Sequence, residues 1–352
     1  PAGPRRLTSE ILSSRPDILT ADLRAMLQER YGGCGVGFVT ITSMTSGYRP
    51  TVRHNFSAGR AIPSWIPYSS TVVNRAFRDT ISFRIPAPTW NFADRRTTHP
   101  GSIPANTLPS SFIIKRSHPL ASVNKGEPQT ETFPPTGELR EMDVTGHIGS
   151  VRWKVESADS TLFYGLAMDG TQGIIVDNFS LRGSSGLSLR SVPVWMMREF
   201  NEQRPYDLII LQYGLNVATE RGRNYDRYRD GMATTIAHLK NAFPQAGILI
   251  VSVGDREYKT EEGDLRTMPG IKNLVRYQQN LAADSGVAFW NMFEAMAARA
   301  VWRIWYMPSP LWPIMIIAYQ LPWRQASAGL LYEALIYGKE QYDRRRAYEA
   351  EP

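Results

Sequence analysis

The stretch from Asp207 to Asn216, DLIILQYGLN, places a continuous apolar run directly before a glycine turn and an asparagine. A second run of the same kind follows at Gly247–Val253, GILIVSV. Short apolar runs that alternate with amphipathic helices are typical of a parallel sheet that is covered on both faces. The sequence therefore predicts an α/β fold whose core sheet contains these two strands.

Helical spacing of apolar side chains predicts a first helix at 20–30, which Gly32 and Gly33 end. The remaining patterns predict helices at 225–242, 271–285 and 327–342, and strands at 151–155, 162–168, 173–176 and 287–290. From 43 to 135 the composition shifts to Pro, Ser, Thr and Arg, which predicts loops and short strands. We therefore expect a β-rich insertion at 43–150, between a first segment of the α/β domain at 1–42 and its remainder at 151–345.

Composition bounds the class of protein. The 352 residues are 42% apolar and 21% charged, which excludes a disordered chain. Cys34 has no partner for an internal disulfide, and the five histidines lack metal-ligand spacing, so no metal is expected. A net charge of +7 without a long basic run argues against a nucleic-acid partner. No run of about eighteen uncharged apolar residues predicts a membrane span. The oligomeric state stays open.

The chain begins at Pro1 and not at methionine. We therefore expect that an amino-terminal segment is missing from it, and an export signal could have been lost with that segment.

Two segments lie where open α/β sheets place their binding sites, beyond the carboxyl ends of strands. They are 176–186, VDNFSLRGSSG, and 211–216, LQYGLN. The Asn216 amide and the backbone N–H of Gly183 could both donate to a developing oxyanion. On spacing alone a second interpretation stays open, in which Gly183, Gly186 and Gly214 are turn glycines and Asn216 is a helix cap.

These segments, with GILIVSVGDRE at 247–257 and the order of elements, resemble the SGNH (GDSL-type) hydrolase superfamily. The likeness is to bacterial exported members with a β-domain inserted after the first helix, and it covers 20–42, 150–296 and the last helix. It implies a three-layer flavodoxin-like sandwich with a parallel sheet. It also implies ester hydrolysis without a cofactor, on an acylated carbohydrate, in the periplasm or outside the cell. By this resemblance Gly183 and Asn216 contribute to the oxyanion hole.

Two blocks of that family are absent from the chain as written. A Gly-Asp-Ser nucleophile turn should precede the first helix, but residues 7–18 read LTSEILSSRPDI. An Asp-x-x-His pair should precede the last helix, but no histidine follows His238. Without these residues the triad chemistry of the family is not possible, so the chain as written should have negligible esterase activity.

Back-translation offers an explanation for both losses. With permitted third bases, the neighbouring frame of 8–18 reads FGDSQFEAGY. The same treatment of 299–317 gives GGMADMVYAKPPLANNDY, and the other frame from Ala318 gives HINSPGGK. We hypothesise that frameshifts at both ends, through sequencing error or gene decay, removed the triad. The shifted Ser would straddle Ile11 and Leu12, the Asp Met315 and Ile316, and the His Ala318 and Tyr319. The Trp-rich segment 301–323 would then be a product of the wrong frame.

Other nucleophiles are poorer candidates. Ser184 and Ser185 do not fit the GxSxG elbow of α/β-hydrolases and are interpreted as turn residues. Ser13 and Ser14 lie near the expected block, but Pro16 disfavours a strand-to-helix turn there.

Four further features have ordinary structural interpretations. The GGCGVG motif at 32–37 follows a helix, so we expect a loop and not a dinucleotide site. Asp177 is expected to bond its own backbone in a turn, and His147 and His238 to be surface or helix residues.

Two other functions stay open: a polysaccharide O-acyltransferase on the same fold, and a non-catalytic carbohydrate-binding protein that binds through the insertion.

Overall fold

The protein is known from a computed structural model. It describes residues 5–11, 18–40, 49, 51–56, 77–84, 103–106, 110–112, 118–123, 126–127, 129–130, 138–143, 145–157, 162–180, 183–298 and 312–350. Ser13 and Ser14 lie outside the described residues.

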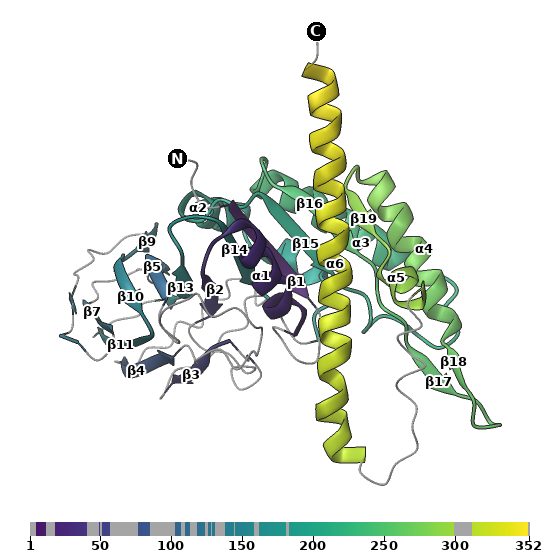
Figure 1. Cartoon of the computed structure of the whole chain (residues 1–352), viewed down its shortest axis with the longest axis horizontal. Coiled ribbons are helices and arrows are strands. Elements are labelled where there is room, and N and C mark those ends of the chain that lie inside the picture. Colours follow the sequence, from purple (N-terminus) through teal and green to yellow (C-terminus); the bar gives the residue numbers. More distant parts are fainter. Residues whose placement is uncertain are drawn as a thin grey trace.

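Five parallel strands form the central sheet, in the order β14, β1, β15, β16 and β19 (Figure 1). Their bounds are Ile174–Asn178, Arg5–Ile11, Leu208–Gln212, Gly247–Val251 and Ala288–Trp290 respectively. Four of these strands fall on predicted apolar patterns. β1 was not predicted, because RRLTSEI carries charged residues where a central parallel strand is ordinarily apolar.

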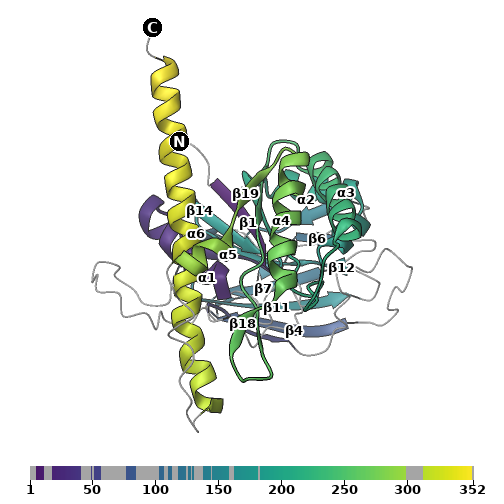
Figure 2. The same ribbon diagram turned by 90° about the vertical axis from the view of Figure 1, so that its right-hand side faces the viewer.

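Helices cover both faces of this sheet, as Figure 2 shows. One face carries α1 (Ile18–Tyr31), α5 (Met292–Ala298) and α6 (Trp312–Ala350), and the other carries α2 (Val194–Gln203), α3 (Asp226–Ala242) and α4 (Pro269–Asp284). Within β15, Ile210 packs on the α1 side, whereas Ile209 and Leu211 pack on the α3 and α4 side. Since neither face meets water, the strand has no polar side and its apolar run is continuous. The predicted three-layer sandwich is confirmed.

The last helix is longer than predicted. α6 covers Trp312–Ala350, whereas the apolar spacing indicated 327–342. Its anchor on the body is the contact of Ala328 and Leu331 with Leu23 of α1, all of them fully buried. Beyond residue 342 no glycine or proline interrupts the sequence before Pro352, so the helix continues as an extension from the body (Figures 1 and 2).

The β-rich part of the chain forms antiparallel sheets beside the α/β sandwich (Figure 1). One sheet has the order β10 (Thr145–Ile148), β5 (Ile103–Asn106), β13 (Gly165–Asp169) and β2 (Gly35–Thr40). A second has the order β3 (Arg53–Phe56), β4 (Phe77–Arg84), β11 (Ser150–Ser157), β7 (His118–Val123) and β8 (Gln129–Thr130). β12 (Leu162–Phe163), β6 (Ser110–Phe112) and β9 (Leu139–Glu141) form a third, and β17 (Glu257–Lys259) and β18 (Leu265–Thr267) a hairpin after β16.

The boundaries proposed for the insertion, 43 and 150, fall between strands that pair with one another. β2 precedes the first boundary and β13 follows the second, yet the two pair along their length. β13 also pairs with β5, which lies within the proposed insertion. The division into 1–42, 43–150 and 151–345 stays a prediction.

The GGCGVG segment is not a plain loop, because β2 begins at Gly35. A Cβ atom on Gly37 would lie 2.5 Å from both the Asp177 carboxylate and the Val176 carbonyl. Only a glycine therefore lets β2 approach β14 this closely. Gly33, Gly35 and Gly37 thus lie against neighbouring strands too closely for a side chain, which spacing alone did not reveal.

Candidate functional site

The candidate site lies at the carboxyl edge of the central sheet. β14 leads through Asn178 to Gly183, and β15 leads through Gln212 to Asn216. β1 lies between these two strands. Its last residue, Ile11, is in register with Gln212. The carboxyl ends of neighbouring parallel strands share one edge, where open α/β sheets bind their ligands.

Gly183 and Asn216 are in direct contact at this edge. The Asn216 side chain donates from Nδ2 to the carbonyl oxygen of Gly183 over 2.8 Å. Both residues are exposed, and Gly183 has φ +81°, which L side chains rarely adopt. The structure thus brings the two predicted residues together. Their role as oxyanion donors stays a prediction.

A tight turn presents Asn216. Gly214 has φ +118°, and its carbonyl accepts hydrogen bonds from the backbone N–H groups of Val217, at 2.9 Å, and Ala218, at 3.2 Å. Asn216 is therefore held within a closed turn, while its side chain is turned towards Gly183. The interpretation of Gly214 as a turn glycine is compatible with a functional Asn216, since the turn is what directs the amide.

Ser184 serves the turn after Gly183. Its Oγ accepts from the backbone N–H of Gly186 at 3.1 Å and lies 3.3 Å from the Ser188 hydroxyl. Ser185 is half-buried beside it. His238, the last histidine of the sequence, lies on α3, where its Nε2 bonds the Val192 carbonyl at 2.7 Å. His147 lies in β10.

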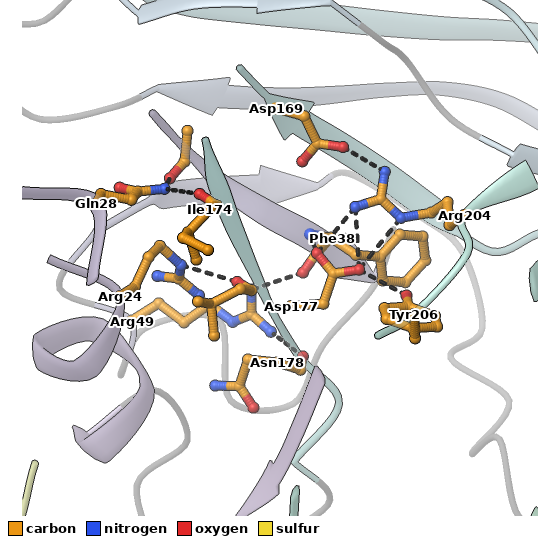
Figure 3. A network of polar contacts seen from close by, with 12 residues as sticks. Arg24, Gln28, Phe38, Arg49, Asp169, Ile174, Asp177, Asn178, Arg204 and Tyr206 are labelled. Carbon is orange, nitrogen blue, oxygen red and sulfur yellow. Dashed lines mark hydrogen bonds and ion pairs between the residues drawn. The ribbon is translucent and has the colours of Figure 1, made fainter. Parts of the chain in front are cut away.

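Asp177 does not bond its own backbone, contrary to the sequence-based expectation. Its carboxylate is fully buried at the end of β14 and accepts from the Phe38 N–H at 2.8 Å, the Tyr206 hydroxyl at 2.6 Å and the Arg204 guanidinium at 2.9 Å (Figure 3). The neighbouring Asn178 forms the local turn bond instead, with Ser180 N–H at 2.9 Å. The carboxylate of Asp177 is a structural anchor between strands.

Arg204 is the centre of this cluster. It follows α2, is fully buried, and reaches a second buried carboxylate, Asp169 of β13, at 2.5 Å. Burial by itself would lower the pKa of Arg204, but Asp177 and Asp169 raise it well above its ordinary value. Burial and then Asp177 raise the pKa of the Tyr206 hydroxyl. The cluster ties β2, β13 and β14 together, and sequence reasoning missed it because its members are distant along the chain.

Within the described ranges, no three side chains of the types His, Cys, Asp or Glu gather as a metal site would require. In the same part of the chain no helix is both long and apolar enough to span a membrane.

Comparison with known proteins gives a likeness of fold. No protein-family model matches the sequence, and no curated protein matches it. The solved structure of a peptidoglycan O-acetylesterase is similar with a TM-score of 0.64 at 18% identity, over 95% of this chain and 91% of that one. A family two carbohydrate esterase from Cellvibrio japonicus aligns with a TM-score of 0.25 at 10% identity, over 68% of this chain and 89% of that one. The likeness to the O-acetylesterase, at 18% identity, concerns the fold alone.

Proposed function

This chain has the fold that its resemblance to SGNH hydrolases predicted, and from that premise we propose that it carries the scaffold of a serine ester hydrolase. Its substrate would be an acetylated carbohydrate, such as one of the cell envelope, met in the periplasm or outside the cell. The observation that carries this proposal is the contact of Asn216 with Gly183, which lie in the segments that follow the two strands flanking β1.

The geometry suits acyl transfer at the end of β1. Ser9 is in register with Asn178 and Ile11 with Gln212, so β1 ends between the segments that lead to Gly183 and Asn216. A serine hydroxyl there would attack the ester carbonyl as a histidine removes its proton and an aspartate orients that histidine.

The oxyanion would be held by N–H donors. A side-chain amide nitrogen carries two hydrogens, and only one of those on Asn216 is needed for the Gly183 carbonyl. The second can donate to the tetrahedral intermediate together with the backbone N–H groups of Gly183 and of the nucleophile.

The chain as written would lack turnover, because β1 ends in Glu10 and Ile11 and no serine. The frameshift hypothesis accounts for this. It puts the lost serine between Ile11 and Leu12, at the end of β1. It also accounts for Glu10 in a central strand with parallel partners on both sides.

The test compares p-nitrophenyl acetate hydrolysis by this chain and by a chain with both frames repaired. We expect turnover only from the repaired chain. In that chain Asn216→Ala should lower kcat about 10²- to 10³-fold, as loss of one oxyanion donor does. The control Asn224→Ala removes an exposed asparagine that bonds Asp226, and should leave kcat unchanged.

Strong turnover by the unrepaired chain would refute the inactivity. Equal kcat for Asn216→Ala and Asn224→Ala would refute the oxyanion role. Resequencing the DNA tests the frameshifts separately, since an uninterrupted frame ends that hypothesis.

A further inference from the structure

Gln278 is a polar side chain in an apolar environment. It lies on α4 and is 3% exposed, on the buried face that also includes Leu274, Leu281 and Ala282. Burying an amide costs free energy unless both of its ends find hydrogen-bond partners. The partners of Gln278 therefore indicate why an amide stands at this position.

Both ends of the amide bind backbone beyond the central strands. Nε2 donates to the carbonyl oxygen of Tyr213 at 2.7 Å, and Oε1 accepts from the N–H of Val253 at 3.0 Å. Tyr213 is the first residue after β15, and Val253 follows shortly after β16. One side chain thus joins the segments that leave two neighbouring strands at the edge of the candidate site.

The donor end acts next to the turn of Asn216. Tyr213 precedes Gly214, and a Cβ atom on Gly214 would lie 3.1 Å from Gln278 Nε2 and 3.0 Å from the Val253 side chain. The turn is therefore packed directly against the amide. The hydrogen bond to Tyr213 fixes the start of that turn, and its closure by Gly214 directs the Asn216 amide to Gly183.

We propose that Gln278 is the positioning residue for Asn216, acting through the Tyr213 carbonyl. The proposal rests on the proposed function for its catalytic meaning, but the positioning itself is measurable without turnover. It predicts that the hydrogen-bond donor of Gln278, and not the volume of its side chain, determines how strongly the Asn216 amide is protected from hydrogen exchange.

The chain offers a matched control in Gln28. This glutamine lies on α1 and also donates to two backbone carbonyls, those of Gly35 at 3.2 Å and Ile174 at 3.1 Å. Ile174 begins β14, so Gln28 acts at the opposite edge of the sheet from Asn216. Variants of the two glutamines remove the same groups from different ends of the fold.

The experiment uses the full chain labelled with ¹⁵N-asparagine, and Asn216→Asp identifies the side-chain amide signal of Asn216. Hydrogen exchange of that amide is measured in the unmodified chain and in Gln278→Glu, Gln278→Met, Gln28→Glu and Gln28→Met. Gln278→Glu keeps the shape and the acceptor for Val253 but, when ionised, has no donor for Tyr213. Thermal unfolding of each variant shows that it is folded at the temperature of the measurement.

We expect the Gly183-bonded proton of Asn216 to exchange about tenfold faster in both Gln278 variants, the factor typical of one lost hydrogen bond. Both Gln28 variants should leave that exchange unchanged. Unchanged exchange in folded Gln278→Met, which has no donor at any pH, would overturn the proposal, as would an equal acceleration in the Gln28 variants. The proposed function fails independently, if Asn216→Ala leaves kcat unchanged in the repaired chain while the exchange data support positioning.

Discussion

Replacing Arg204 by methionine should destabilise the protein strongly. The change keeps most of the side-chain volume but leaves the carboxylates of Asp169 and Asp177, both at most 2% exposed, without the guanidinium between them. Removing one partner of a buried ion pair typically costs about 3–5 kcal/mol. Because one cation serves two carboxylates here, we expect a loss near the upper value, about 5 kcal/mol. That is a third or more of the stability of an ordinary domain.

The assay is urea unfolding at neutral pH, followed by tryptophan fluorescence. Arg198→Met is the matched control, because Arg198 lies on α2, is exposed, and donates to the Asn241 carbonyl at 3.1 Å. Its replacement should cost about 0.5 kcal/mol or less. Asp169→Asn should fall between the two, since it leaves Arg204 paired with Asp177. Equal unfolding midpoints for Arg204→Met and Arg198→Met would refute the reasoning.

Two further predictions concern the same regions. Gly214→Ala should lower the free energy of unfolding by about 1–3 kcal/mol, because φ is +118° and the new Cβ would lie 3.0 Å from Val253; an unchanged urea midpoint would contradict this. The raised pKa of Tyr206 means that the folded state keeps a proton which the unfolded chain releases above about pH 10, so stability should fall as pH rises past that point. Tyr206→Phe should make this fall shallower in urea titrations, and an identical slope would argue against it.

The sequence predicted the parts of the fold that rest on local pattern. The runs at 208–211 and 248–251 are apolar throughout because helices cover both of their faces, so their pattern predicted strands correctly. β1 could not be predicted, because its charged residues do not have the pattern of a buried strand. Only its pairing with β14 and β15 identifies it as one. In the β-rich part, short strands of mixed composition carry little periodic signal.

Of the candidate site, too, the sequence predicted only the residues that follow a local pattern. Glycine and asparagine directly after strands pointed to Gly183 and Asn216, which meet in the structure. Arg204 and Gln278 were missed, because each acts through contacts far away along the chain and neither stands in a recognisable motif. A polar residue at a core position of an amphipathic helix, as Gln278 is within α4, was the one available signal.

The pairing of β2 with β13 has a consequence for how such a chain can change. Thr40 and Gly165 face each other as the last matched residues of the two strands, and the Arg204 cluster holds Phe38 of β2 and Asp169 of β13 farther along the same pair. The chain between residues 41 and 164 therefore departs and returns at two adjacent strand ends, about 5 Å apart. A module exchanged there would keep both strand ends, but it would also have to replace the hydrogen bonds from Arg49 to the Asn178 carbonyl and from the Leu139 N–H to Glu199.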